Sequence, residues 1–472
     1  MAVTARPTLE QINDGPNDQP ANDGHLFPPT GQLSFLERLP AEIIQDIASY
    51  LSAQDLGCLG ATSQALVDHA SNDLLWAKLV NERLPAPIQS SGPFGSFRRL
   101  YLAYHPCWFI PQHKVWVADN EHTGMLIIAR YDNLRGVIEA YQVVAARGTP
   151  EFQTWISHPE VIIQSFEPNV HLDMGDDPVL SLNDPNPSSR TAPIQSLQSM
   201  KEKRQMSMAS HVQHIYKPLS FCSELSPQGP WVNPDVLWPP QTIPSNARTV
   251  RDLEDSPPPI LNHSSELSES FFRVRKWVNP GLMFSHPPKQ ANLTCSTLDP
   301  VLYTPTPEKP YQGIWIGDYS AHGCEFLLVL QKDTTTVAHG DENESQIMDT
   351  QNEVEYGDQE NIEDIGQRGQ LQAVKLTGDP NVPRGQFSFV AEDIGSRGLI
   401  SVEMEEPFVG ARSVRCRGHV AGLGFHDDTY IDSQLILISP DHMAHYWREM
   451  GHVSYYHRVD IDALLRTCEA HM

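Results

Sequence analysis

The chain has 472 residues and a formal net charge of -26, with 59 acidic against 33 basic side chains. Its length predicts about three domains and at least one sizeable core. The acidic balance argues against nucleic acid, whose phosphates need a basic surface, and against an anionic membrane as partner. No apolar run approaches the ~20 residues of a membrane span, and residues 1–32 lack the apolar core of a secretory signal.

The seven cysteines are scattered, odd in number and without a C-x-x-C pair, which favours reduced thiols in the cytoplasm or nucleus. We expect no metal and no other cofactor. His442 and His445 have the spacing of two ligands on a helix face, but no third ligand of fitting spacing accompanies them. Cys324 beside His322 resembles a thiol with a base, without an orienting third group. Nucleophile, nucleotide-loop and zinc-protease motifs are missing from the sequence, so we expect a non-catalytic protein.

Composition divides the chain into ordered and low-complexity parts. Of the 39 prolines, 21 fall within 178–310, and 341–365 has ten acids and no Lys or Arg. Such charge density predicts a solvated segment. The expected divisions are a disordered tail (1–32), a helical module (33–84), a helical connector (85–106), a β domain in three parts (107–177, 311–340 and 366–462), a largely disordered insertion (178–230), a proline-rich, partly ordered segment (231–310) and an acidic disordered insertion (341–365).

The module 33–84 has a helical period. Pro40 suits the first position of a helix, and an apolar stripe follows at helical spacing: Ile43, Ile44, Ile47 and Leu51. Ser52 with Asp55 resembles a capping box that opens a second helix. A third helix is expected to begin near Asp73.

The residues from Leu36 to Leu79, LERLPAEIIQDIASYLSAQDLGCLGATSQALVDHASNDLLWAKL, resemble an F-box. The resemblance implies an SCF-type (cullin-RING) ubiquitin ligase, in which the helices dock on the Skp adaptor and the adaptor links to the cullin scaffold. It implies these adaptor-binding residues: Leu36, Leu39, Pro40, Ile43, Ile44, Ile47, Leu51, Leu56 and Trp76. The alternative is an ordinary three-helix bundle whose Leu and Ile side chains all face inward.

From Trp108 onward the pattern becomes strand-like, with short segments rich in Val, Ile and Tyr between polar turns. The proline-rich segment contains two aromatic stretches that a linker does not need, Val236–Ile243 and Phe271–Val278, and we expect both to be ordered. The predicted fold class is multidomain α+β. A three-helix module precedes a mainly antiparallel, β-barrel-like domain with disordered insertions.

Two segments of the β domain join strands through Gly/Asp turns: YQGIWIGDYSAHGCEF (311–326) and LTGDPNVPRGQF (376–387). With CRGHVAGLGF (416–425), they resemble the cyclin-D1-binding domain found beside the F-box in one F-box-only family. The resemblance extends in pieces over 107–177, 231–278 and 300–460, and the insertions resemble those of fungal members. It implies a barrel that selects substrates for ubiquitination, which in animal members include cyclins and chains read at their C-terminal end.

The turns at 317–323 and 378–385 lie at predicted strand ends, where glycine frees backbone donors. Arg415 and Arg417 are two apart and share a strand face, and together with Arg384 they would suit a carboxylate or phosphate. The candidate substrate-binding residues are Asp318, Tyr319, His322, Asn381, Arg384, Arg415 and Arg417. The alternatives are turns that only keep strand register and arginines that form a solvated surface.

These patterns predict the substrate receptor of an SCF ubiquitin ligase, with a protein substrate and with neither nucleic acid nor membrane as partner. A second hypothesis is a barrel that binds a small apolar ligand, with the F-box acting outside ubiquitination. The inward side chains of the barrel distinguish the two, because a ligand cavity needs small residues and a packed core needs large ones.

Overall fold

The structure is a computed structural model that describes residues 34–120, 122–149, 151–175, 178–183, 219–223, 267–276, 291–333 and 366–470. It divides into two compact units, residues 1–75 and 76–472. The expected tail (1–32), the aromatic stretch Val236–Ile243 and the acidic insertion (341–365) lie outside the described residues. None of the helices in the described ranges is long and apolar enough to cross a bilayer.

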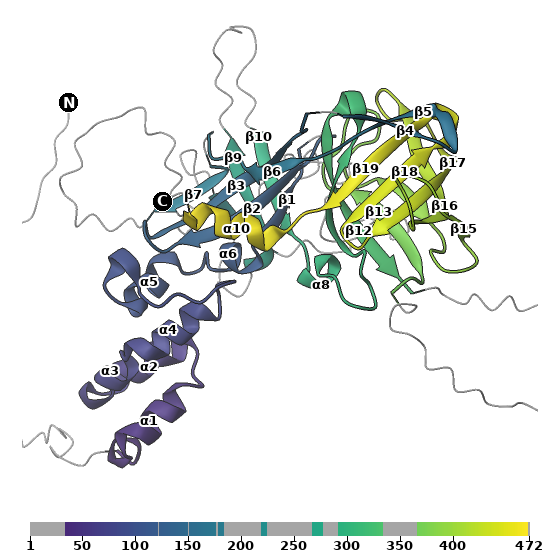
Figure 1. Cartoon of the computed structure of the whole chain (residues 1–472). Helices are drawn as coiled ribbons and strands as arrows, with labels where there is room; N and C mark the ends of the chain where they lie inside the picture. Colours follow the sequence, from purple (N-terminus) through teal and green to yellow (C-terminus); the bar gives the residue numbers. More distant parts are fainter. Residues whose placement is uncertain are drawn as a thin grey trace, which may run out of the picture. The chain divides into compact units, whose positions relative to one another are not determined.

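The first unit consists of short helices (Figure 1): η1 (Leu36–Arg38), α1 (Ala41–Ala48), α2 (Ala53–Thr62), α3 (Gln64–Ala70) and the start of α4 (Asp73–Asn81). Helices this short are stable only through packing, and Ile44, Leu56 and Leu66 are buried. The predicted helix start at Ser52 is present, because its Oγ accepts a hydrogen bond from the Asp55 backbone N–H at 3.2 Å. The three predicted helices correspond to α1, α2 and α4. The sequence reading missed α3, a helix of two turns.

The second unit begins with helices that lead into the sheets: the rest of α4, then η2 (Gly92–Phe94), α5 (Phe97–Tyr104) and α6 (Phe109–His113). Ser96 caps α5, the expected connecting helix, by accepting a hydrogen bond from the Arg99 backbone N–H at 3.3 Å. The strand-like reading from Trp108 was wrong for α6. Its first residues, Phe109 and Ile110, are completely buried, and a short buried apolar run has the same pattern in a helix and in a strand.

An open antiparallel sheet comes next. Its hydrogen-bonded order is β6-β3-β2-β1-β10-β9-β8, and β7 also pairs with β3. Its strands are β1 (Val115–Ala118), β2 (Met125–Asp132), β3 (Val137–Ala146), β6 (Asn169–Leu172), β7 (Leu180–Asn183), β8 (Leu219–Ser223), β9 (Leu267–Lys276) and β10 (Ala291–Thr297). The aromatic stretch from Phe271 therefore lies in β9, as far as it is described. Two strands, β7 and β8, fall inside the insertion 178–230 that was expected to be largely disordered.

A closed antiparallel barrel follows, in the order β11-β12-β13-β14-β16-β17-β18-β19, and the pairing of β11 with β19 closes it. Its strands are β11 (Gly313–Asp318), β12 (Cys324–Lys332), β13 (Gln370–Lys375), β14 (Phe387–Ala391), β16 (Arg412–Gly422), β17 (His426–Ser439), β18 (His442–Trp447) and β19 (His452–Arg458). Outside this ring, β15 (Leu399–Val402) pairs with β16, and the hairpin of β4 (Phe152–Trp155) and β5 (His158–Gln164) joins β19. The predicted fold class is confirmed. The β domain drawn from the sequence, however, consists of two sheets.

Large side chains fill the barrel interior. One cluster of completely or nearly completely buried residues comes from all eight strands and includes Trp315, Leu327, Leu371, Phe389, Val414, Leu435, Met443 and Tyr456. Inward residues of this size give a packed core. This observation favours a receptor with a solid barrel over one that encloses a small apolar ligand.

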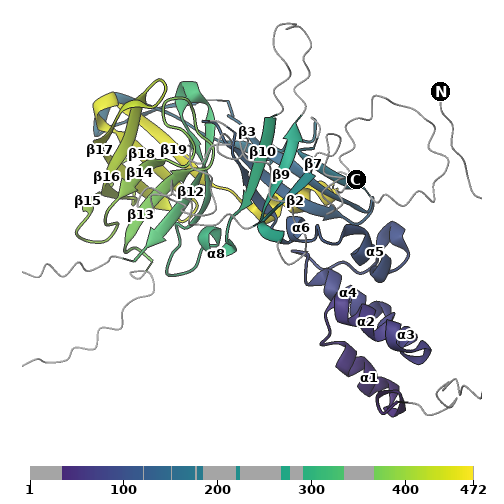
Figure 2. The same ribbon diagram turned by 180° about the vertical axis from the view of Figure 1, so that it is seen from behind.

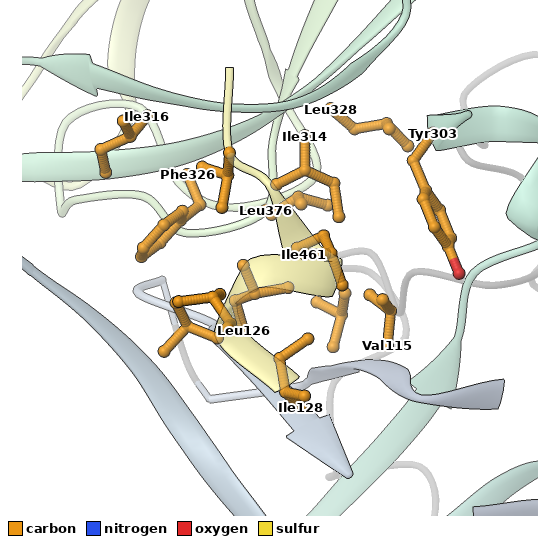
Figure 3. Close-up of a cluster of buried hydrophobic side chains, with 14 of the residues drawn as sticks. Val115, Leu126, Ile128, Tyr303, Ile314, Ile316, Phe326, Leu328, Leu376 and Ile461 are labelled. Carbon is orange, nitrogen blue, oxygen red and sulfur yellow. The ribbon is translucent and has the colours of Figure 1, made fainter. Parts of the chain in front are cut away.

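The open sheet and the barrel share a second core of buried side chains. Figures 1 and 2 show the C-terminal segment of the chain running from β19 of the barrel to the open sheet. The C-terminal helix α10 (Ile461–Ala470) contributes Ile461 and Leu464 to it. Figure 3 shows Ile461 between Leu126 and Ile128 of the open sheet and Ile314 of the barrel. Short helices complete the unit: α8 (Pro300–Tyr303), η6 (Ser320–His322) and η7 (Arg448–Met450). The last helix of the chain thus packs both sheets into one body.

Candidate functional site

The helices of the first unit leave large apolar side chains in solvent. Ile43 and Ile47 of α1 are exposed, and so are Phe35, Tyr50 and Leu74, with exposed fractions from 42% to 82%. Ile43 and Ile47 lie four residues apart on the helix, so their side chains are neighbours on one face. The neighbouring Ile44 and Ala48 face inward. The amphipathic helix α1 therefore presents two apolar faces, one for the core and one for a partner.

The predicted adaptor-binding residues divide into two groups. Pro40, Ile43 and Ile47 are exposed, and Leu36, Leu39 and Leu51 are half-buried. Ile44, Leu56 and Trp76 are buried. We assign these last three to the protein core, because a fully buried side chain cannot contact an adaptor without rearrangement. Trp76 lies in the second unit and packs edge-on against Tyr101, with 5.5 Å between ring centres.

One end of the barrel holds a buried charged triad. The Lys375 ammonium lies 2.7 Å from a Glu325 carboxylate oxygen and 2.9 Å from one of Asp379, and all three side chains are buried. The ammonium also lies over the Tyr319 ring, 4.5 Å from its centre, and the Tyr319 hydroxyl bonds to Ser388 Oγ. The sequence reading did not select Glu325 or Lys375. Charged residues at inward positions of apolar strands were the available signal.

One proton neutralises this triad. Burial raises the pKa of Glu325 to about 8, against the influence of Lys375. Burial also acts to raise the pKa of Asp379, but the hydrogen bond with Glu325 and the Lys375 ammonium hold it below its usual value. At neutral pH, Glu325 therefore carries a proton, while Asp379 is ionised. The Lys375 ammonium lies within 3 Å of both carboxyl groups, and this buried arrangement suits a rigid support better than a reactive group.

Asp379 shapes the turn above the triad. Its Oδ1 accepts hydrogen bonds from the backbone N–H groups of Asn381 (2.6 Å) and Val382 (3.0 Å), and it lies 4.0 Å from the imidazole of His322. The Asn381 side-chain amide donates to the Ala421 carbonyl at 2.9 Å. These contacts place Tyr319, His322 and Asn381 at one barrel end. His322 is the most exposed of these three.

Other candidates have structural partners. Asp318 is buried and pairs with Arg147, which also donates to the Ser320 carbonyl at 2.8 Å. Arg384 has no exposed surface and bonds to backbone carbonyls of the open sheet. It therefore cannot form a receptor with Arg415 and Arg417, and this part of the sequence hypothesis was wrong.

Arg415 and Arg417 share the outer face of β16, where the alternate residues Val414 and Cys416 face the core. Arg417 pairs with Glu392 at 2.6 Å, and Arg415 donates to the Arg397 carbonyl at 3.1 Å. Each arginine is exposed. This arrangement is typical of a solvated surface rather than of a built anion site.

Neither of the two enzyme-like pairs has the surroundings of a reactive site. His442 and His445 lie three apart on β18, so they face opposite sides of the strand. His445 is buried against Ser433 Oγ at 2.7 Å, and burial lowers its pKa to about 3. Burial raises the pKa of the Cys324 thiol, which opposes thiolate formation. Across the described ranges, no group of three His, Cys, Asp or Glu side chains is arranged to hold a metal ion.

Two of the pockets among the described residues lie outside the barrel. The larger of these two, of about 620 Å³, is lined by the segment 84–93, the end of β2 with the turn after it, and Leu465. Its buried Arg130 is paired with Glu139 at 2.6 Å. The smaller, of about 230 Å³, lies beside an exposed ion pair of Arg83 with Glu269. In both pockets the charged groups named are already matched within the protein.

Comparison with known families agrees with this architecture. The model of the F-box-like domain matches residues 36–82, and the model of the cyclin D1 binding domain matches residues 295–463. The chain thus contains an F-box-like domain followed by a cyclin D1 binding domain, as the sequence indicated. The second match includes the whole barrel and excludes β1–β9.

A relative shares part of this chain. It is Protein EXECUTER 2, chloroplastic, of Arabidopsis thaliana, 29% identical over 145 residues. The shared part covers 30% of this chain and 20% of that protein.

Proposed function

We propose that this protein is the substrate-recognition subunit of an SCF-type E3 ubiquitin ligase. In this proposal, the F-box-like unit binds the Skp adaptor, and through it the cullin scaffold, while the barrel unit binds a protein substrate. F-box domains support a substrate-adaptor role in such ligases in general, and the subunits that carry them are typically non-catalytic. The scattered cysteines support a site of action in the cytoplasm or nucleus.

The observation that carries the proposal is the exposed apolar face of α1. A helix that turns Ile44 into the core and Ile43 and Ile47 into solvent suits helix-in-groove recognition. An adaptor that covers the exposed face of α1 removes apolar area from water, which is the main favourable contribution to most protein association.

The substrate site we propose is the barrel end that carries Tyr319, His322 and Asn381. The buried triad beneath it holds Tyr319 and the 378–385 turn in place before any ligand arrives, which lowers the entropic cost of binding. The chain itself needs no reactive group for ubiquitin transfer. It would act by holding a substrate lysine near the conjugating enzyme that carries ubiquitin as a thioester, which raises the effective concentration of the lysine at the thioester.

Adaptor binding is tested by changing the exposed residues of α1. The variant Ile43→Ala with Ile47→Ala should lose the adaptor in co-purification, with affinity reduced roughly 30-fold or more, because truncated anchors of an interface commonly cost 2 kcal/mol or more. Glu42→Ala with Asp46→Ala, on the same helix, is the matched control and should retain the adaptor. Wild-type adaptor binding by the isoleucine variant would contradict the proposal.

A further inference from the structure

Strand β15 has an unpaired edge. Among the described strands it is hydrogen-bonded to β16 alone, with Val402 opposite Arg412. Ile400, Ser401 and Val402 make no backbone hydrogen bond with any other described element. Because alternate backbone groups of an edge strand point away from the ladder, this edge offers donors and acceptors to an additional strand.

The chain that follows β15 fixes this edge in place. The Glu403 backbone N–H donates a hydrogen bond to the Ala411 carbonyl, and the Glu403 carbonyl accepts one from the Gly410 N–H, both at 2.8 Å. These bonds close the loop 403–411. In this loop Phe408 is buried and packs edge-on against Trp155, with 5.0 Å between the ring centres. Ser157 Oγ donates to Glu405 Oε2 at 2.7 Å. An edge held by a buried aromatic pair does not need to be ordered when a partner binds.

The two faces of the edge differ in chemistry. Val402 and Met404 are 47% and 81% exposed, and their spacing places them on one face. Ile400, which is 44% exposed, lies at a register shift between Leu399 and Ser401 and adds apolar surface beside them. The alternate residues Ser401 and Glu403 share the other face, since their side chains hydrogen-bond at 2.8 Å. Glu405 and Glu406 extend the acidic character, and no Lys or Arg occurs between residues 398 and 411.

We propose that the free edge of β15 is a docking site for an extended protein segment in which apolar residues alternate with Lys or Arg. The backbone of such a segment would continue the ladder, as in β-strand addition. Its apolar residues would lie beside Ile400, Val402 and Met404, and its cations beside Glu403 and its acidic neighbours. A second copy of this chain fits less well, because it would bring the same acids to the contact.

This surface is separate from the proposed substrate site. β15 pairs with the start of β16 near Ser413, whereas Asn381 bonds to Ala421 near its end. At ~3.3 Å per residue, the two contacts lie roughly 25 Å apart along the strand. A segment bound to β15 would therefore leave the barrel end accessible, and the inference goes beyond the proposed function.

The probe is a fluorescein-labelled synthetic peptide, Lys-Val-Arg-Val-Lys-Val-Arg, titrated onto the full chain by fluorescence anisotropy. Two control peptides replace every Lys and Arg by Glu, or the central Val by Pro. We expect binding of the basic peptide, at least tenfold weaker binding of the proline peptide, which lacks a ladder donor, and none of the acidic peptide. Hydrogen exchange of residues 400–402 should slow when the basic peptide is bound.

Charge reversal completes the test. The variant Glu403→Lys with Glu406→Lys should bind the basic peptide at least tenfold more weakly than the wild type and should bind the acidic peptide. Its melting temperature should be unchanged. Natural proteins also place charges on edge strands to prevent pairing. That role alone predicts no binding by the wild-type chain, and this result would overturn the proposal. So would equal binding of the proline peptide, or exchange protection confined to other residues.

Discussion

Replacing Arg384 by Met tests whether this residue supports the fold or binds a ligand. Its guanidinium is completely buried, and it donates to the carbonyls of Asn120 at 2.8 Å and Asp119 at 3.2 Å. Its backbone N–H donates to the His122 carbonyl at 2.8 Å. These three bonds join the 378–385 turn of the barrel to the β1–β2 turn of the open sheet. The variant removes the two side-chain bonds and should therefore destabilise the whole second unit.

The expected loss follows from the charge left behind. The Asp119 carboxylate is also buried, and its Oδ1 accepts the Thr294 backbone N–H at 2.7 Å. The variant also removes the guanidinium donor from the carbonyls of Asn120 and Asp119. The loss of such a bond costs about 1–3 kcal/mol, so for the two bonds a loss of about 2–6 kcal/mol of unfolding free energy is expected. In a domain of this size that corresponds to a fall in melting temperature of roughly 10 °C.

The loss should depend on pH. Burial raises the pKa of Asp119, and Arg384 opposes the rise, so the variant should raise this pKa further. An acid whose pKa is higher in the folded than in the unfolded state loses stability as pH rises above the unfolded value. The deficit of Arg384→Met should therefore be larger at pH 7 than at pH 4 to 5.

Urea or thermal unfolding of the full chain measures both effects. Adding Asp119→Asn to Arg384→Met should recover part of the stability and remove the pH dependence of the deficit. Arg417→Met, on the exposed face of β16, is the matched control and should melt like the wild type. A stable Arg384→Met variant with a wild-type pH profile would refute the structural role and restore Arg384 as a candidate ligand residue.

Two further predictions concern the barrel. Burial raises the pKa of Glu325 to about 8, so the stability of the wild type should fall as pH rises from 5 to 8. The variant Glu325→Gln should flatten this fall in melting curves. An identical pH profile of the two proteins would show that Glu325 is not protonated in the fold. Deleting residues 341–365 should change the unfolding free energy by only about 1 kcal/mol, because loop closure depends weakly on length, and collapse of the fold in urea titrations would contradict this.

Sequence patterns were sufficient where local chemistry decides the structure. The helix start at Ser52 and the stripe on α1 follow from capping and periodicity. The Gly/Asp sequences at 317–323 and 378–385 are turns between strands, as their composition indicates. Patterns failed where a long-range contact decides. Nothing beside Arg384 in the sequence indicates that its guanidinium reaches Asn120, and nothing near Glu325 indicates Lys375. Likewise, the separation into two sheets depends on which strands pair, and strand segments alone do not carry that information.

The hairpin of β4 and β5 has a consequence for synthesis on the ribosome. Ile162 pairs with His452, so β5 must wait for about 290 further residues before its neighbour exists. At roughly 5–20 residues per second, this delay is about 15–60 s. Through that interval, Trp155, Val161 and Ile163 lack the strands that cover them in the finished protein. Nascent chains should therefore need a chaperone over this hairpin, and chains that stop before β17 should aggregate through it.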